Sequence, residues 1–243
     1  MRMRKKKNGE ARLLASAEVI FEKPASPMTD PAAAMGRAGR AVFLEIGAGK
    51  GGFACEMAKG NPDACYFAME KVSDCVVLAA EKAIREKAER EDNLRFRVDT
   101  ADNLTEIFAN GTVDKIFLNF SDPWSKKGYA KRRLTHRRYL SVYFNLLREG
   151  GTLTFKTDNV GLFDFSLEEI SAMGLTPHIV TRDLHASEWN EGNVMTEYEK
   201  AFSSQGIKIN MLSVKKPVGF SCEIPLEFSE SKERFYRKNG DSE

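Results

Sequence analysis

The sequence lacks any long apolar segment. No uncharged apolar run in its 243 residues approaches the roughly 18 residues that a membrane-spanning helix needs, which argues against a membrane protein. Five of the first seven residues are basic, but no apolar stretch follows them, so the start of the chain does not have the pattern of a secretory signal peptide. We therefore expect no membrane partner.

Cysteine and histidine are both scarce. The cysteines form no C-x-x-C pair, and the histidines show no metal-ligand spacing with each other or with a cysteine. These residues are Cys55, Cys65, Cys75, Cys222, His136, His178 and His185. We expect free buried thiols in a reducing cytoplasm, hence a cytoplasmic protein, and no metal ion held by the protein.

The chain also lacks a large excess of charge of either sign, because 37 basic residues against 35 acidic ones leave a net charge of only +2. The basic residues are nevertheless concentrated in two places, the first seven positions and residues 126–138. Such a run is typical of a solvated helix face as well as of a nucleic-acid-binding surface. Charge alone leaves both interpretations open.

Apolar runs alternate with amphipathic segments along most of the chain. We expect strands at 41–46, 64–69, 94–98, 113–120, 152–157, 176–181 and 207–214. Between them we expect helices at 50–59, from residue 72 onward, and at 104–108, 134–148 and 162–173, with Gly150-Gly151 ending the helix at 134–148. Strands that alternate with helices indicate an α/β fold with a doubly wound, mostly parallel, seven-stranded sheet.

The same pattern divides the chain into three parts. Residues 41–216 form the predicted α/β domain. Residues 1–40 are a basic N-terminal segment that includes a loose connector at 24–40, rich in proline, glycine and alanine. Residues 217–243 are a polar C-terminal tail of irregular structure.

A glycine-rich segment at 47–52 follows the first predicted strand and precedes the first predicted helix. Glycines at such a junction let the backbone approach a ligand, and the helix N-terminus offers free N–H groups. Gly47, Gly49 and Gly52 fit the dinucleotide pattern G-x-G-x-x-G, and Glu70 ends the second strand, where a carboxylate accepts hydrogen bonds from ribose hydroxyls. A tight turn beside an unrelated surface Glu70 would produce the same pattern.

Glu45 favours S-adenosylmethionine over NAD as the ligand of this segment. A carboxylate two residues before Gly47 would be unfavourable beside a pyrophosphate, but it suits a ligand that carries an ammonium and a sulfonium group. No downstream segment resembles a hydride-transfer site. An acid at the end of the third strand, Asp99 or Asp102, would complete the adenine side of the pocket, although either could equally cap the helical segment that follows.

The fourth predicted strand continues into Asp122-Pro123-Trp124, and the basic run begins directly after it. Because ligands of open α/β sheets lie beyond the carboxyl ends of the strands, we expect Asp122 to face the cofactor crevice. A carboxylate can accept hydrogen bonds from the N–H groups on the edge of a base, while an aromatic ring stacks on its face. An aromatic ring beside a cationic surface makes nucleic acid the favoured partner.

The sequence resembles the bacterial tRNA (guanine-N7-)-methyltransferases from its first residues to about Lys216. The similarity lies in six separate segments in the family's order, such as Asn-Phe-Ser-Asp-Pro-Trp at 119–124, and this is far more specific than a glycine-rich loop alone. The other segments are 45–51, 131–135, 155–159, 183–187 and 193–199. The chain departs from the family's pattern at Ser125, where proline is expected, and at Gly128-Tyr129, where Arg-His is usual. Residues beyond Pro217 have no clear counterpart.

This resemblance implies the Rossmann-like class I methyltransferase fold, and methyl transfer from S-adenosylmethionine to N7 of a guanine in the tRNA variable loop. The expected cofactor site consists of Glu45, Gly47, Gly49, Glu70, Asp99 or Asp102, and Asp122. The expected nucleotide contacts come from Lys126, Asp158, Thr196, Glu197, Tyr198 and Glu199. The acid of the third strand is offset by one residue from the family's position, so the choice between Asp99 and Asp102 stays open.

N7 of guanine has a free lone pair and no proton to lose, so its methylation needs no general base. We expect catalysis by in-line positioning, with Asp122 as the catalytic residue that offsets the positive charge developing on the purine. Asp158 and Glu197 are candidate helpers, and Trp124 could stack on the exposed base. The alternatives are a class I methyltransferase with another substrate and a non-catalytic RNA-binding protein. The sequence does not choose between a monomer and a homodimer.

Overall fold

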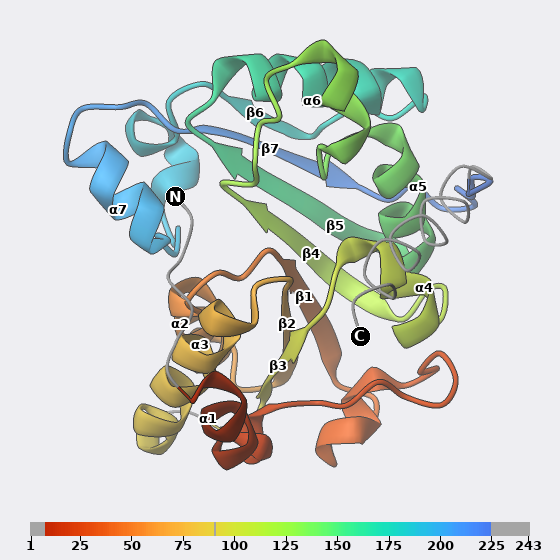
Figure 1. The fold of residues 1–243 in the computed structure, drawn as a ribbon. Helices are drawn as coiled ribbons and strands as arrows, with labels where there is room; N and C mark the ends of the chain where they lie inside the picture. The colour runs from red at the N-terminus through yellow and green to blue at the C-terminus, as the bar shows by residue number, and fades with distance from the viewer. Residues whose placement is uncertain (1–7, 90, 225–243) are drawn as a thin grey trace.

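The computed structural model describes residues 8–89 and 91–224, which contain a seven-stranded sheet. The strands lie in the order β3-β2-β1-β4-β5-β7-β6 (Figure 1). Their bounds are Ala41–Ile46 (β1), Ala64–Glu70 (β2), Leu94–Val98 (β3), Val113–Asn119 (β4), Leu147–Thr157 (β5), Ile179–Thr181 (β6) and Asn210–Lys215 (β7). The first five strands are mutually parallel, and β7 pairs antiparallel with both β5 and β6. The predicted doubly wound, mostly parallel sheet is therefore confirmed.

The order of the strands reverses between β1 and β4. The chain moves outward from β1 through β2 to β3, then crosses back and continues on the other side of β1 with β4 and β5. Loops that leave the carboxyl ends of β1 and β4 consequently turn in opposite directions. In open α/β sheets, ligands bind in the crevice between two such diverging loops.

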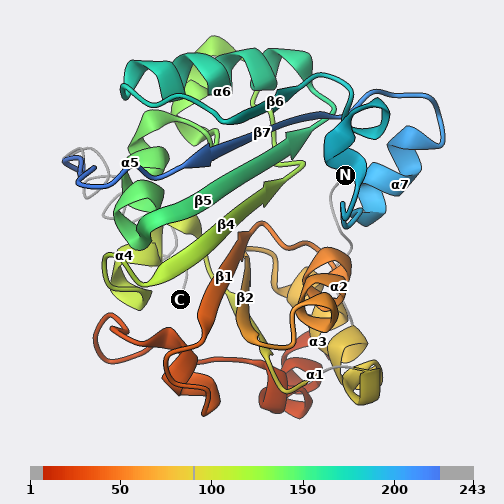
Figure 2. The same cartoon turned by 180° about the vertical axis from the view of Figure 1, so that it is seen from behind.

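Helices cover both faces of the sheet (Figures 1 and 2). Their bounds are Gly9–Ala15 (α1), Gly52–Gly60 (α2), Ser73–Arg85 (α3), Leu104–Ile107 (α4), Arg137–Leu146 (α5), Val160–Ala172 (α6) and Glu197–Ser203 (α7). Within the described ranges, no helix is long and apolar enough to cross a bilayer.

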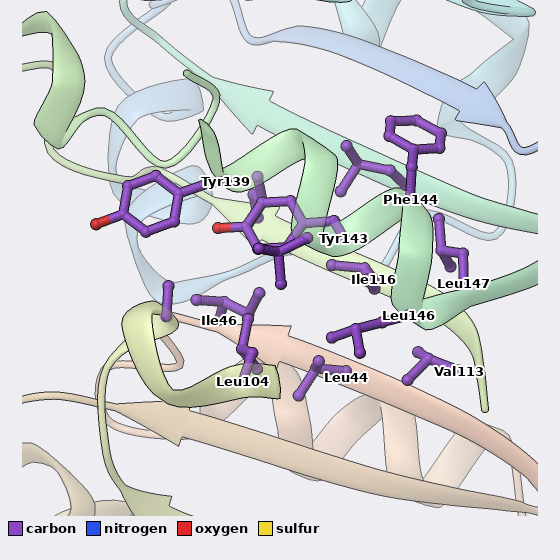
Figure 3. Close-up of a cluster of buried hydrophobic side chains, with 14 of the residues drawn as sticks. Leu44, Ile46, Leu104, Val113, Ile116, Tyr139, Tyr143, Phe144, Leu146 and Leu147 are labelled. Carbon is purple, nitrogen blue, oxygen red and sulfur yellow. The ribbon is translucent and has the colours of Figure 1, made fainter. Parts of the chain in front are cut away.

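Alternate residues of the central strands supply two separate cores. On β1, Leu44 and Ile46 pack with side chains of α4 and α5 (Figure 3), whereas Phe43 belongs to the core formed with α2 and α3. Because successive strand side chains point to opposite faces, Glu45 shares the face of Phe43. The buried carboxylate of Glu45 therefore lies on the side of the sheet that α2 covers.

The predicted helix at 134–148, with Gly150-Gly151 as its end, is wrong at its carboxyl end. Helix α5 ends at Leu146, and β5 begins at once and runs through both glycines. The pairing of β4 with β5 shifts register between Val113 and Lys115, so the glycines lie at a bulge. A Cβ atom on Gly151 would lie 2.8 Å from the carbonyl oxygen of Asp114, which explains why a glycine is needed there.

The segment at 24–40, expected to be a loose connector, is packed against the domain. A short 3₁₀ helix at Pro31–Met35 buries Ala32 and Met35 in the core beside α4 and α5. Upstream, Ile20 forms an isolated bridge with Phe96 of β3. The proline and glycine content does not reveal these tertiary contacts.

Candidate functional site

The loop between β1 and α2, here called the glycine loop (residues 47–52), has an open side and a packed side. Gly47 and Gly49 have φ values of +84° and +54°, and a Cβ atom at either would meet nothing within 4 Å. Gly51, at φ +75°, is packed, because a Cβ atom there would lie 2.7 Å from Cβ of Ala79. Glycine is thus required by backbone conformation at all three positions. The open side leaves room for a ligand close to the backbone.

Glu70 lies at the end of β2 and supports the glycine loop. Its Oε2 accepts a hydrogen bond of 3.1 Å from the backbone N–H of Gly49, and its Oε1 accepts one of 2.9 Å from the N–H of Val72. Each carboxylate oxygen can accept a second hydrogen bond. Glu70 is partly exposed, so it has both the position and the acceptor capacity to receive ribose hydroxyls.

Glu45 is almost fully buried and only partly satisfied. Its Oε1 accepts a hydrogen bond of 3.1 Å from the side-chain amide of Asn119, and the buried hydroxyl of Tyr66 lies close enough to lower the pKa of this carboxyl. Its Oε2 makes no hydrogen bond of good geometry within the described residues. Burial raises the pKa of Glu45 to about 7, and the amide of Asn119 and the ammonium of Lys156 oppose this shift. A buried carboxylate with an unused oxygen is suited to a cationic ligand.

The two candidate acids after β3 have different surroundings. Asp99 is nearly buried, and its carboxylate accepts hydrogen bonds from Arg97, Thr100 and Asn103 at 2.8, 2.8 and 2.7 Å. Asp102 is more exposed, and its Oδ1 lies 3.2 Å from the hydroxyl of Tyr139. Asp99 therefore stabilises the turn after β3, and Asp102 is the acid with more accessible surface.

Asp122 lies in a strained loop after β4, here called the Asp-Pro-Trp loop (residues 120–124). Phe120 and Trp124 have φ values of 52° and 40°, which residues with side chains rarely adopt. Arg133 holds this conformation by donating to the carbonyl oxygens of Pro123 and Trp124 at 3.0 and 3.2 Å. The carboxylate of Asp122 is 65% exposed and lies 3.3 Å from the ammonium of Lys71.

An aromatic and cationic cluster adjoins Asp122. The guanidinium of Arg132 lies 5.0 Å from the ring centre of Trp124 and 4.7 Å from that of Tyr129. The two rings are 5.9 Å apart in an edge-on arrangement, and the ammonium of Lys71 is 6.0 Å from Trp124. Such a cluster offers stacking and positive charge to a nucleic acid at one place.

The segment that contains the other predicted nucleotide contacts forms the N-terminus of α7. Thr196 caps this helix by accepting from the N–H of Glu199 at 2.9 Å. Tyr198 is exposed and stacks on Phe120, with ring centres 6.4 Å apart. The carboxylate of Glu197 is about half exposed and reaches Lys82 at 4.0 Å. Helix α7 is thereby joined to the Asp-Pro-Trp loop on one side and to α3 on the other.

The remaining predicted contacts differ in accessibility. Lys126 is exposed beside the aromatic and cationic cluster, and Asp158 follows β5 with partial exposure. Glu199 is fully buried, and its carboxylate accepts from Lys156 at 2.6 Å and from Asn193 at 2.7 Å. In this structure Glu199 lies behind the site and does not present an oxygen at the surface.

The basic run at 126–138 is less uniform than its sequence suggests. Arg133 is bound to the Asp-Pro-Trp loop, Arg137 pairs with the carboxylate of Glu169 at 2.9 Å, and Arg138 lies 3.4 Å from Asp102. Three of the seven charges therefore hold the fold together. The other basic cluster, at residues 1–7, lies outside the described residues.

Sequence reasoning missed Lys156 and Asn119 as site residues. Both are buried next to Glu45 at the ends of β5 and β4, where they are directly paired in the sheet. A lysine between Phe155 and Thr157, at the end of a predicted strand, is a signal that could have been noticed. Its partner Glu199 is 43 residues away, however, so only the folded chain shows the pair.

The described residues contain no group of three or more His, Cys, Asp or Glu side chains that could hold a metal ion. None of the four cysteines, all of which are described, is joined in a disulfide, and Cys55 and Cys65 are buried. The site is therefore built from carboxylates, glycine backbone, aromatic rings and cations.

A family model described as "Putative methyltransferase" matches residues 39–212, which is well over half of the chain. The chain belongs to this family. It is the family of the tRNA (guanine-N7-)-methyltransferases, so the resemblance carried by the sequence motifs is confirmed.

Solved structures of methyltransferases share the fold. One described as an antibiotic-related methyltransferase is 19% identical, with a TM-score of 0.55 over 76% of this chain and 90% of its own. The 16S rRNA methyltransferase KamB is 12% identical, with a TM-score of 0.59 over 82% of this chain and 99% of its own. A variant 16S rRNA (adenine(1408)-N(1))-methyltransferase from Catenulisporales acidiphilia, with S-adenosylmethionine as cosubstrate, is 13% identical, with a TM-score of 0.52 over 79% and 92%. These similarities confirm the Rossmann-like methyltransferase fold.

S-adenosylmethionine, the cofactor expected for this methyltransferase, fits the residues present. The unpartnered Oε2 of buried Glu45 suits the ammonium group of the ligand's methionine part. The open side of Gly47 and Gly49 leaves space for the ligand to lie close to the protein backbone. Glu70 can accept further hydrogen bonds from the ribose of the ligand. Three features at the carboxyl ends of β1 and β2 thus match three parts of one molecule.

Proposed function

We propose that this methyltransferase transfers a methyl group from S-adenosylmethionine to N7 of a guanine in the variable loop of tRNA, and that it does so in the cytoplasm. The observation that carries the proposal is the Asp-Pro-Trp loop, whose backbone is strained at Phe120 and Trp124 and which presents the exposed carboxylate of Asp122 beside an aromatic and cationic cluster. Family membership supports the same reaction.

When bound, S-adenosylmethionine supplies an electrophilic methyl group. The lone pair of N7 forms the new N–C bond while the S–C bond breaks, and the bonding electrons of the S–C bond stay on sulfur. No proton leaves N7, so the purine acquires a positive charge. In this scheme Glu45, Glu70 and the glycine loop orient the donor.

Asp122 is the residue best placed to act on the purine. Its carboxylate can accept hydrogen bonds from the N–H edge of guanine and offset the charge that develops on the ring. Trp124 supplies a stacking face, while Lys126 and Arg132 attract the phosphates around the target. Asp158, Glu197 and Tyr198, from the two neighbouring segments, complete the proposed base pocket.

The decisive experiment is a nucleoside map. Unmodified tRNA and, in parallel, ribosomal RNA are incubated with the protein and labelled cofactor, digested, and analysed by mass spectrometry for the position and identity of each methylated base. We expect 7-methylguanosine at one position in the variable loop of tRNA. Methylation of ribosomal RNA alone would establish a methyltransferase with another substrate, and no methylation despite RNA binding would indicate a non-catalytic RNA-binding protein.

A further inference from the structure

Lys156 is a charged residue in the interior whose three ammonium protons are all used. Its Nζ donates to Oε2 of Glu199 at 2.6 Å, to the carbonyl oxygen of Val194 at 2.9 Å and to Oδ1 of Asn193 at 3.1 Å. The side chains of Lys156 and Glu199 are 3% and 0% exposed. All three acceptors belong to residues 193–199, the segment that leads into α7.

The backbone of the same lysine holds a second part of the site. Its carbonyl oxygen accepts a hydrogen bond of 2.9 Å from the N–H of Phe120, the first residue of the Asp-Pro-Trp loop. Phe120 in turn stacks under Tyr198 of α7. The end of β5 is thus hydrogen-bonded to both the Asp-Pro-Trp loop and the segment that begins α7.

The cofactor side of the site also touches this lysine. Lys156 lies with its ammonium 5.1 Å from the ring centre of Phe53 in α2, and its charge acts on the buried carboxylate of Glu45. The ammonium of Lys156 therefore lies between the end of β1 with Glu45, the Asp-Pro-Trp loop and α7.

We propose that Lys156 is a positioning residue, and that its ion pair with Glu199 holds the 193–199 segment over the cofactor end of the sheet so that Glu197 and Tyr198 meet the substrate. The inference rests on the proposed function for the identity of that substrate. Glu199 then serves the reaction through Lys156, because its buried carboxylate is already surrounded by protein groups. It accepts from Lys156 and Asn193, and its Oε1 lies 3.3 Å from Nε2 of His185. The resemblance alone would assign Glu199 a direct nucleotide contact.

A double-mutant cycle separates these two roles. Lys156→Met, Glu199→Gln and the double variant are compared with wild type for KM and kcat on tRNA and for affinity for S-adenosylmethionine. Each single change leaves a buried partner unsatisfied, so we expect KM for tRNA to rise at least tenfold, with a smaller change in kcat. The double variant should be no worse than the worse single variant, because both changes break one interaction.

Effects that multiply in the double variant would overturn the proposal, because they would show that Glu199 and Lys156 act independently. Lys216→Met is the matched control. Lys216 is another buried lysine, bound to the carbonyl oxygen of Leu147 at 2.7 Å at the opposite end of β5, and its loss should leave KM for tRNA unchanged.

Hydrogen exchange of the free protein provides a readout that requires no RNA. Amides of residues 197–203 should exchange at least tenfold faster in Glu199→Gln than in wild type, and as slowly as wild type in Lys216→Met. If wild type fails to methylate tRNA, the proposed function is wrong, and this measurement still tests the positioning role. Unchanged exchange in Glu199→Gln would refute the positioning role. This test does not depend on whether Lys156→Met folds.

Discussion

At the scale of single residues, Glu45 shows how burial prepares a carboxylate for a cation. In the folded protein its pKa is raised to about 7, so near neutral pH it is only partly ionised. Because the folded-state pKa lies above the unfolded one, the protonated form is favoured by folding, and stability falls as pH rises from the unfolded pKa towards 7. A cationic ligand that paired with the ionised carboxylate would recover this loss.

We predict that affinity for S-adenosylmethionine falls as pH is lowered below about 7, by up to roughly tenfold for each pH unit, because Glu45 must lose its proton to bind the ammonium group. Calorimetric titrations between pH 6 and 8 measure this dependence. Glu45→Gln is the control, since it keeps the shape and removes the titration. Equal pH dependence in both proteins would show that Glu45 does not bind the cation.

Asp122 presents the opposite situation, because its carboxylate is mostly exposed and, within residues 8–89 and 91–224, forms an ion pair with Lys71 alone. Exposed ion pairs of this kind add little to stability. A substitution at Asp122 should therefore leave the fold intact and report on function alone.

We predict that Asp122→Asn lowers the single-turnover rate of tRNA methylation by about a hundredfold or more, the scale of one preorganised electrostatic group. Affinity for the cofactor should change much less, because Glu45 and Glu70 remain. Asp63→Asn is the matched control, since Asp63 is also exposed and pairs with Arg40 at 2.9 Å at the amino ends of β1 and β2, away from the site. A rate within a few-fold of wild type would remove Asp122 from the mechanism.

At the scale of elements, the stretch from Trp124 to Arg133 divides its cations between two tasks. Arg132 is exposed and lies against the rings of Trp124 and Tyr129, whereas Arg133 is half-buried and bound to two carbonyl oxygens of the Asp-Pro-Trp loop. Arg132 and Arg133 are neighbours of the same residue type, but they have different surroundings. A count of basic residues in the sequence does not distinguish them.

We predict that the double variant Lys126→Gln, Arg132→Gln reduces the slope of log affinity for tRNA against log salt concentration by roughly 0.7 to 0.9 for each phosphate that the two side chains no longer neutralise. Arg133→Gln should leave this slope nearly unchanged and should lower kcat, because it releases the Asp-Pro-Trp loop. Filter-binding assays at several salt concentrations, together with single-turnover rates, distinguish the two. A reduced slope in Arg133→Gln would show that this residue also binds phosphate.

At the scale of the whole molecule, the core under α5 contains an unusual pair of tyrosines. Tyr139 and Tyr143 lie one turn apart with their rings stacked 6.3 Å apart (Figure 3). The hydroxyl of Tyr139 is hydrogen-bonded to Asp102 at 3.2 Å, whereas the buried hydroxyl of Tyr143 has no partner among the described residues. An unsatisfied buried hydroxyl destabilises the folded state.

We predict that Tyr143→Phe raises the free energy of unfolding by about 1 kcal/mol, since it removes an unsatisfied polar atom without changing the packing. Tyr139→Phe should lower it by roughly 0.5–1.5 kcal/mol through loss of the bond to Asp102. Urea denaturation of both variants measures the difference. A loss of stability in Tyr143→Phe would show that its hydroxyl has a bound partner such as water.

Local sequence patterns were enough to predict the fold class, most element positions and the family. Apolar periodicity depends on neighbours in the chain, so strands such as β1 and helices such as α3 could be located from local patterns. The carboxyl ends of parallel strands lie side by side, so the sequence could also place the candidate site there. This site comprises the glycine loop, Glu45, Glu70 and Asp122. Gly150-Gly151 is compatible with the end of a helix and also with a bulge in a strand. The sequence did not show that the bulge in β5 would form.

The contacts that hold the site together become visible only in the folded chain. The contact of Asn119 with Glu45 spans 74 residues and that of Lys156 with Glu199 spans 43, and neither leaves a periodic trace in the sequence. Burial is likewise a property of the folded chain: it raises the pKa of Glu45, removes Glu199 from the surface and separates Arg133 from Arg132 in function. Residue type sets the chemistry that a side chain can perform, and the packing of distant segments decides which groups are free to perform it.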